Sequence, residues 1–437
     1  MFLISTDIPQ WISTQKNLDF LELSDNQLTG KFPLWLAEME IEILLLLGNK
    51  LSGSIPSRLF QSSRLSILAL SRNKFSGELP KNIGDATKIR VLVLSANNLS
   101  GAIPKSVADI PRLELLDLSK NRFSGNILPV FDPNGSLAYV DFSSNELSGD
   151  IPASFCTRIS FLALGGNKFS GKLPRDLTNM YGLVYLDLHD NNITGNFPEF
   201  LSEMPNLQVL SVRNNSLHGS LPPKLFFNQS LLQILDISSN NLVGRIPSEL
   251  GNLKGMSGTL VRYMGALSND ELHLDVMEGT ITSNDGMLTF TMEINDLIVN
   301  WKNAIQGLPS LKRYLYTLLD LSKNKLSGEI PTSLGNLKGL KLLNISNNRL
   351  SGCIPQSFGD LESIETLDLS NNNISGTIPQ SFRKLNQLSV FDVSNNKLSG
   401  KIPRGGQMDT MNYPSYFVNN SGLCGMQIRV KCSAIQH

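Results

Sequence analysis

Leucines alternate with other residues in short segments that return at nearly constant spacing along the chain. Around Leu113, Leu116 and Leu118 the alternation predicts a short strand with its leucines on one face. Each such segment is followed by an asparagine, at Asn26, Asn49, Asn73, Asn97, Asn121, Asn145, Asn167, Asn191, Asn215, Asn240, Asn324, Asn348, Asn372 and Asn396. One repeat cannot bury its own leucines, so neighbouring repeats must stack and share a core.

The second half of the repeat reads Leu-Ser-Gly-x-Ile-Pro, as in residues 51–56 and 326–331. Gly permits a turn and Pro ends strand pairing, so this half should lead the chain away from the sheet. Short helical or 3₁₀ turns such as residues 333–337 then return it to the next strand. The pattern predicts an α/β solenoid of about 14 leucine-rich repeats, with a concave parallel sheet and short helices on the convex side. The asparagine column should serve structure, because a buried amide can pair backbone groups where the chain leaves the strand.

Composition and motifs argue against nucleic-acid binding, metal binding and catalysis. The 38 basic and 38 acidic residues cancel, which leaves no basic field for nucleic acid. The four histidines are scattered without metal-ligand spacing, and no phosphate loop or nucleophile elbow occurs. We therefore expect no enzyme activity, no cofactor and no metal site.

One segment interrupts the repeats. Between Asn240 and Asn324, residues 254–313 lack the pattern, although residues 288–294 alternate strictly and predict a strand with one buried face. The expected organisation is leucine-rich repeats at 1–253, beginning inside a repeat, an island at 254–313, four closing repeats at 314–403 and a cap at 404–437. The island is either a recognition element or a passive loop.

The Leu-Ser-Gly-x-Ile-Pro element resembles the plant-specific class of extracellular leucine-rich repeats, and the island before four closing repeats resembles the ectodomains of plant receptor-like proteins. That resemblance implies a ligand-recognition ectodomain on the outer face of the plasma membrane, acting in defence or development through partner receptor kinases. The ligand class, whether peptide, steroid or microbial fragment, stays open. Co-receptors of the somatic embryogenesis receptor kinase type would bind the island and the last four repeats. The alternative is a soluble secreted inhibitor of a cell-wall-degrading enzyme.

Candidate ligand contacts lie on the predicted concave face. Tyr139, Phe161 and Tyr185 occupy one strand position in consecutive repeats, and Arg72, His189 and Arg213 depart from the usual Asp-x-Ser pattern nearby. Aromatic and arginine side chains are favoured at interfaces, although the aromatic residues could instead pack along the sheet. Candidate co-receptor contacts in and beside the island are Tyr263, Trp301, Lys302 and Tyr314.

The cysteines fall into two groups. Cys424 and Cys432 follow the last repeat and resemble the family's closing cap, which implies a disulfide between them. Cys156 and Cys353 lie six repeats apart, too far to pair, and are expected to be buried thiols.

Eight Asn-x-Ser/Thr sequons are glycosylation candidates if the chain is extracellular: Asn98, Asn134, Asn192, Asn214, Asn228, Asn344, Asn373 and Asn419. Neither end carries a signal-peptide core or a run long enough to span a bilayer. By resemblance, we expect the full-length protein to have a membrane anchor and the sequence to be a portion of it.

Overall fold

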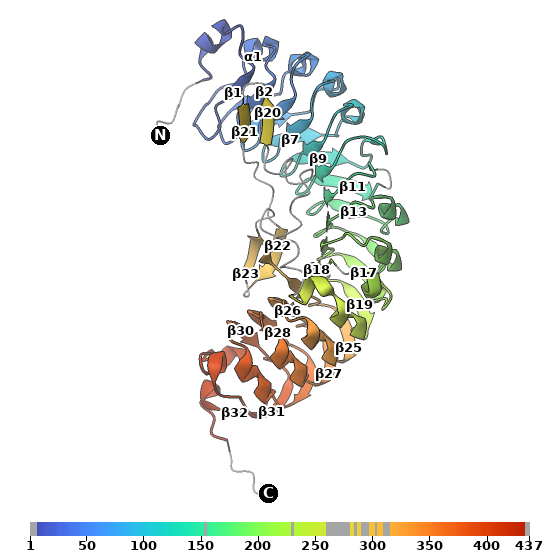
Figure 1. Cartoon of the computed structure of the whole chain (residues 1–437), viewed down its shortest axis with the longest axis vertical. Coiled ribbons are helices and arrows are strands. Elements are labelled where there is room, and N and C mark those ends of the chain that lie inside the picture. The colour runs from blue at the N-terminus through green and yellow to red at the C-terminus, as the bar shows by residue number, and fades with distance from the viewer. Residues whose placement is uncertain are drawn as a thin grey trace. The chain divides into compact units, whose positions relative to one another are not determined.

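The computed structural model describes residues 7–152, 155–228, 231–258, 280–283, 286–289, 297–301, 304–308 and 315–432. The chain forms two compact units, Met1–Ile193 and Thr194–His437, called unit 1 and unit 2 below (Figure 1).

Each unit contains a main sheet of parallel three-residue strands, one from each repeat. In unit 1 the strands are β1 (Phe20–Glu22), β2 (Ile43–Leu45), β4 (Ile67–Ala69), β6 (Val91–Val93), β8 (Leu115–Asp117), β10 (Tyr139–Asp141), β12 (Phe161–Ala163) and β14 (Tyr185–Asp187). In unit 2 they are β16 (Val209–Ser211), β18 (Ile234–Asp236), β24 (Leu318–Asp320), β26 (Leu342–Asn344), β28 (Thr366–Asp368) and β30 (Val390–Asp392). The central residue of these strands is buried and is a leucine in most of them, as in Leu68, Leu92 and Leu116. Each such side chain contributes about 1.5–3 kcal/mol, so the stack of leucines holds the repeats together.

A second parallel sheet runs beside the main sheet in each unit, and here the sequence prediction was wrong. The Leu-Ser-Gly-x segment does not simply turn the chain; it forms strands of its own. Unit 1 contains β3 (Ser52–Gly53), β5 (Lys74–Gly77), β7 (Asn98–Gly101), β9 (Arg122–Gly125), β11 (Glu146–Asp150) and β13 (Lys168–Ser170). Unit 2 contains β15 (Thr194–Asn196), β17 (Ser216–Ser220), β19 (Asn241–Gly244), β25 (Lys325–Glu329), β27 (Arg349–Cys353), β29 (Asn373–Gly376), β31 (Lys397–Lys401) and β32 (Gly422–Cys424). Gly is required within these strands: Gly352 has φ +78°, and a Cβ there would lie 2.9 Å from the Glu329 side chain.

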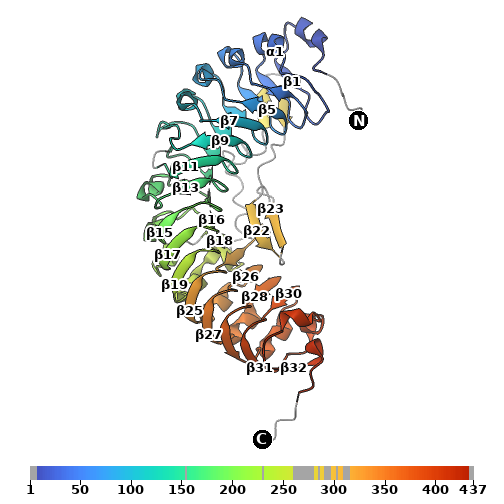
Figure 2. The same cartoon turned by 180° about the vertical axis from the view of Figure 1, so that it is seen from behind.

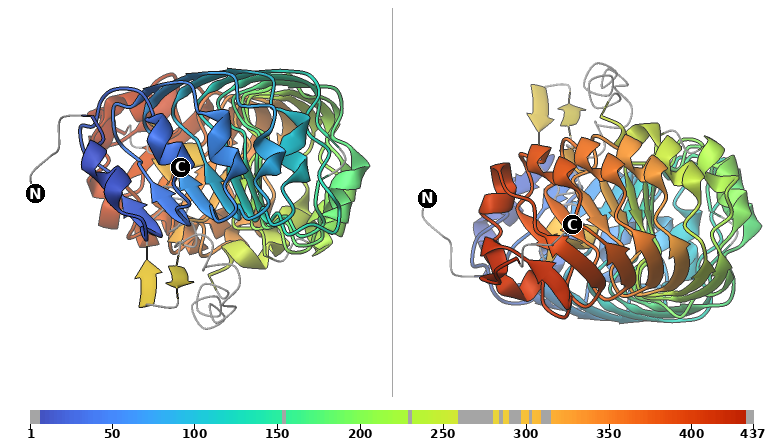
Figure 3. Two further views of the ribbon diagram at one scale, coloured as in Figure 1. Left: turned by 90° about the horizontal axis from the view of Figure 1, so that it is seen from above. Right: turned by 90° about the horizontal axis from the view of Figure 1, so that it is seen from below.

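Short helices lie across the repeat from the main sheet, as the sequence predicts (Figures 2 and 3). Among the described residues these are α1 (Leu34–Glu38), α2 (Leu225–Asn228) and the 3₁₀ helices η1 (Gln10–Thr14), η2 (Ser57–Gln61), η3 (Ile83–Asp85), η4 (Lys105–Asp109), η5 (Arg175–Asn179), η6 (Glu199–Glu203), η7 (Ser248–Asn252), η8 (Lys254–Met256), η10 (Thr332–Asn336), η11 (Gln356–Asp360), η12 (Gln380–Lys384) and η13 (Gly406–Asp409). Two further 3₁₀ helices belong to the cap: η14 (Pro414–Tyr416) follows β30 at the edge of the main sheet, where the Tyr416 carbonyl accepts the Val393 amide, and η15 (Met426–Ile428) follows β32. Many follow directly on the proline of the Ile-Pro pair, as at Pro331 and Pro355, since the fixed φ of proline suits the residue that precedes a helical turn.

The motif asparagines form a ladder of hydrogen bonds along each unit. The Asn97 Oδ1 accepts the Phe75 amide of the preceding repeat at 3.0 Å. Its Nδ2 donates to the carbonyls of Leu70, Leu94 and Ser95 at 3.0–3.1 Å. This geometry confirms the structural role predicted for the column, because each amide satisfies backbone groups that would otherwise be buried unpaired.

The repeats stack directly across the island. β18 pairs with β24 in the ordinary register, with Asp236 opposite Asp320, and β19 pairs with β25. The Asn324 Oδ1 accepts the Leu242 amide at 3.0 Å, the same distance as in an uninterrupted step. Solenoid packing extends slightly past the expected boundary at residue 253, because Met256 is fully buried and its carbonyl accepts the Gly339 amide at 2.9 Å.

Beyond residue 258, the described part of the island consists of two antiparallel hairpins. β20 (Thr280–Ser283) pairs with β21 (Gly286–Thr289), and β22 (Leu297–Trp301) pairs with β23 (Ala304–Leu308). β21 contains the start of the predicted strand at 288–294; residues 290–296 lie outside the described residues.

The cap continues the solenoid by one further step. Asn420, 24 residues after Asn396, takes the ladder position: its Oδ1 accepts the Leu398 amide at 2.9 Å and its Nδ2 donates to the Val393 carbonyl at 2.9 Å. β32 joins the side sheet against β31.

Candidate functional site

The three predicted aromatic residues form a stacked ladder on the main sheet of unit 1. The ring centroids of Tyr139 and Phe161 lie 4.2 Å apart, and those of Phe161 and Tyr185 lie 4.1 Å apart, with nearly parallel planes. The three side chains are only 1–3 % exposed. The ladder therefore stabilises the sheet, at about 0.5–1.5 kcal/mol per ring pair beyond burial, and presents little ring surface to solvent.

Next to the ladder, His189 forms a buried pair with Asp187. Its Nδ1 lies 2.7 Å and 2.9 Å from the two carboxylate oxygens of Asp187, and its Nε2 lies 3.7 Å from Asp190. Sequence reasoning missed the residue that makes this possible. Gly165, one repeat earlier, leaves room for the imidazole, since a Cβ at that position would overlap the His189 ring. The signal was present in the sequence as Ala163-Leu164-Gly165, where other repeats carry Asp-x-Ser.

The two predicted arginines lie apart from the ladder. The Arg72 guanidinium bonds Asp25 at 2.8 Å on the main-sheet side of unit 1, three strands before Tyr139. Arg213 belongs to unit 2, where its Nε lies 3.9 Å from the Asp236 carboxylate and its side chain is 16 % exposed. The candidate ligand contacts thus divide into three local groups: Arg72 with Asp25, the ladder with His189, and Arg213 with Asp236.

Buried aspartates end many main-sheet strands. The carboxylate of Asp117 accepts the Ser119 amide at 3.0 Å, and the same turn recurs at other repeats. Burial raises the pKa of Asp117 and of Asp368. Burial, together with the neighbouring Asp236 carboxylate, raises the pKa of Asp320 to about 8. Ionising these buried carboxylates at the ends of the strands is therefore unfavourable. Asn344, which takes the equivalent place in β26, donates a hydrogen bond to Asp320 at 3.2 Å.

Of the four predicted docking residues, the structure describes Trp301. Trp301 is 5 % exposed and meets Tyr316 edge-on, with ring centroids 5.6 Å apart. The Lys341 ammonium lies 5.7 Å from the Tyr316 ring centroid and 3.8 Å from Glu365. This chain of contacts attaches the β22–β23 hairpin to the closing repeats. Tyr263, Lys302 and Tyr314 lie outside the described residues.

The cysteines differ from one another in exposure. Cys424 and Cys432 form a disulfide with a Cα–Cα distance of 5.1 Å. Cys156 is a buried free thiol, but Cys353 is exposed, contrary to the sequence expectation. Its position explains the difference: it occupies the x of Leu-Ser-Gly-x-Ile-Pro, which faces outward from the side sheet.

Six of the eight sequon asparagines are exposed: Asn98, Asn134, Asn192, Asn214, Asn373 and Asn419. Asn344 must be removed from the glycosylation candidates. It is 4 % exposed within β26 and its side chain accepts the Ser346 amide, so a glycan has no room there. The Asn228 side chain lies outside the described set.

In the part of the chain that the structure describes, no group of three or more His, Cys, Asp or Glu side chains could hold a metal ion. A search of the same residues for membrane-spanning helices, long and apolar enough for the bilayer, found none.

Comparison with protein families identifies leucine-rich repeats along the chain. Models described as "Leucine rich repeat" match residues 54–123, 181–242, 313–374 and 339–398, and also 17–39 and 136–157. These segments together cover more than half of the chain.

Known proteins agree with that result. Over 144 residues, a third of this chain, the sequence is 78 % identical to Receptor-like protein 46 of Arabidopsis thaliana, of which it covers 18 %. Two solved structures of the Arabidopsis receptor kinase HAESA, one with the peptide hormone IDA and the co-receptor SERK1, align over 98 % of this chain at 32 % identity, with TM-scores of 0.68 and 0.70. The chain spans 65 % of those HAESA chains. These relatives indicate an extracellular or plasma-membrane location. The chain belongs to the leucine-rich-repeat family, and its similarity within that family lies with the plant receptor-like proteins, as the sequence predicted.

Proposed function

We propose that this chain is the ligand-recognition part of a plant cell-surface receptor that binds a peptide ligand and signals through a partner receptor kinase. The observation that carries the proposal is the 32 % identity over 98 % of the chain to an ectodomain solved with a peptide hormone and a co-receptor.

The proposed ligand surface is the main-sheet face of unit 1 around His189. The aromatic ladder gives this face a rigid floor, since its rings are buried and stacked. The partly exposed Asp190 beside this floor would then contact the peptide backbone or its charged groups. Arg72, on the same sheet of unit 1, would provide a further contact to acidic groups, and Arg213 would do so separately on the main sheet of unit 2.

The proposed co-receptor surface consists of the closing repeats at Asn324, Asn348, Asn372 and Asn396 with the island beside them. The Trp301–Tyr316–Lys341 contacts support this proposal, because they fix the β22–β23 hairpin on the first of these repeats. A hairpin held in place costs less ordering entropy on binding than a free loop.

The test is replacement of residues 259–314 by a short Gly-Ser linker. The solenoid should stay folded, because β18 and β24 already pair directly. Binding of the SERK1 ectodomain, measured by calorimetry with the full chain as reference, should be lost. Circular dichroism reports folding, and Lys74→Gln, an exposed side-sheet lysine of unit 1 outside the proposed co-receptor surface, is the surface control. A folded deletion variant that binds as well as the parent would contradict the co-receptor proposal; selective binding to a cell-wall-degrading enzyme would favour the inhibitor alternative.

A further inference from the structure

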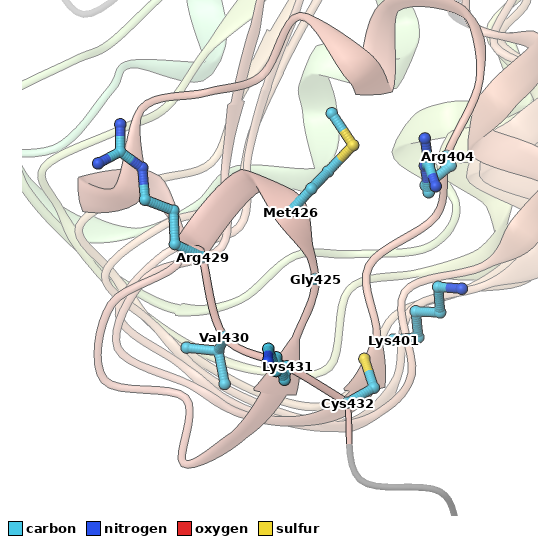
Figure 4. Close-up of a pocket in the computed structure, with 8 residues that line it drawn as sticks. All are labelled: Lys401, Arg404, Gly425, Met426, Arg429, Val430, Lys431 and Cys432. Atoms are coloured by element: carbon cyan, nitrogen blue, oxygen red, sulfur yellow. The ribbon is translucent and has the colours of Figure 1, made fainter.

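The cap contains a cleft of about 350 Å³ that none of the comparisons explains. Figure 4 shows Lys401, the last residue of β31, and Arg404 on one side and residues of the loop between Cys424 and Cys432 on the other. The lining residues are Lys401, Arg404, Gly425, Met426, Arg429, Val430, Lys431 and Cys432.

The cleft is strongly cationic although the chain as a whole is neutral. Residues 397–432 contain the five cations Lys397, Lys401, Arg404, Arg429 and Lys431 and a single carboxylate, that of Asp409. Four of these five cations line the cleft. Among the residues that the structure describes, none of the four forms an ion pair with a carboxylate. The positive charge is therefore available to a ligand.

The loop that carries two of these cations is held rigidly. The Cys424–Cys432 disulfide closes it, and the amides and carbonyls of Gly425 and Val430 bond each other across it at 2.8 Å and 3.2 Å. Gln427, 3 % exposed, donates to the Pro403 carbonyl at 3.0 Å and so ties the loop to the segment that follows β31. A preorganised set of donors loses less entropy on binding than free lysines would.

Apolar side chains stand among the cations. Met426 is 51 % exposed and Val430 is 48 % exposed, and both line the cleft. A free phosphate or a polyuronate chain would gain nothing from these two side chains, whereas a peptide can bring an aliphatic or aromatic residue against them. We propose that the cap cleft binds an acidic peptide segment of a partner protein, one that places an apolar side chain between its carboxylates.

The proposal goes beyond the proposed function and can fail separately from it, because its test uses neither the island nor a co-receptor. The probe is a fluorescein-labelled peptide of sequence Gly-Asp-Leu-Glu-Asp-Phe-Glu-Gly, titrated with the full chain by fluorescence anisotropy. The cleft variant is Lys401→Gln with Lys431→Gln, and the matched control is Lys325→Gln with Lys397→Gln, two exposed side-sheet lysines outside the cleft. We expect the cleft variant to bind at least tenfold more weakly and the control to bind within twofold of the parent.

Three further arms decide the ligand class. Replacing Leu and Phe of the probe by Gly should weaken binding about tenfold, as should Met426→Ser with Val430→Thr. Raising the salt from 50 to 300 mM should weaken binding by screening the carboxylates. Inorganic phosphate and trigalacturonate should compete poorly. Equal binding by the parent and the cleft variant would overturn the site, and equal competition by trigalacturonate or by the Gly-substituted peptide would overturn the peptide assignment. Thermal melts check folding, and Lys401→Arg, which keeps the charge, should bind like the parent.

Discussion

Replacing a single ladder asparagine should destabilise unit 1 far more than its small side chain suggests. Asn97→Ala removes one acceptor, used by the Phe75 amide, and two amide hydrogens shared among three carbonyls. The side chain is 8 % exposed, so water cannot easily replace these partners. The neighbouring Asn98 is exposed and provides a matched control.

The size of the effect follows from the four contacts. A typical hydrogen bond contributes about 0.5–1.5 kcal/mol net, and a buried group left unpaired costs about 1–3 kcal/mol. Because three of the contacts share one amide nitrogen, we expect a total loss of about 4 kcal/mol for Asn97→Ala. Asn97→Asp keeps the acceptor but loses every donor, so it should be at least as damaging. Asn98→Ala should change the free energy of unfolding by about 0.5 kcal/mol or less.

The assay is urea denaturation combined with native-state hydrogen exchange. The Phe75 amide donates to Asn97 Oδ1, so its exchange should accelerate in Asn97→Ala and stay unchanged in Asn98→Ala. Comparable losses in the two alanine variants, or a loss below about 1 kcal/mol for Asn97→Ala, would refute the ladder argument.

Three further outcomes are expected. Between the ordinary aspartate pKa of 3.8 and the folded value of about 8, the folded protein keeps a proton on Asp320 that the unfolded chain releases. Stability should therefore fall as pH rises through this window. Asp320→Asn should flatten the change in urea midpoint between pH 5 and pH 8, and an unaltered slope would exclude Asp320 as its source. Opening the disulfide with Cys424→Ser and Cys432→Ser should destabilise the cap by about 2.5 kcal/mol for an eight-residue separation, seen as faster proteolysis within residues 425–431, whereas equal protease resistance would show that the backbone bonds suffice. Phe161→Ala should cost about 3–5 kcal/mol in a urea titration while Phe161→Tyr stays near neutral; a mild alanine variant would mean that the rings do not support the sheet.

Much of the fold could be predicted because its signals are periodic. The alternation of leucines with other residues predicted the strands and their buried face. The spacing of the motif asparagines located the gap between Asn240 and Asn324. The side sheet escaped prediction because a glycine at φ near +80° normally ends a strand, whereas here its missing Cβ lets adjacent repeats approach. Asn420 was overlooked because the leucines around it are replaced by other residues, although its 24-residue spacing from Asn396 was visible.

The candidate sites were less predictable, because burial depends on contacts between repeats. The sequence placed Tyr139, Phe161 and Tyr185 at one strand position, but ring stacking and burial at 1–3 % follow only from the register of β10, β12 and β14. Trp301 likewise looked like a surface anchor until its contact with Tyr316 was known. Periodicity predicts which column a residue occupies, but not what covers that column.

The asparagine ladder also has an evolutionary consequence. Its bonds join fixed positions of spatial neighbours, so the step from Asn324 back to Leu242 has the same length as any other, although 82 residues separate the two in sequence. The hydrogen bonds of the ladder do not depend on the number of residues inserted between two consecutive asparagines. The segment between the repeats at Asn240 and Asn324 can therefore be lengthened, shortened or exchanged during evolution without compensating changes in the repeats on either side. Such a joint allows new recognition loops to be sampled at little risk to folding, which is what a lineage of diversifying receptors requires.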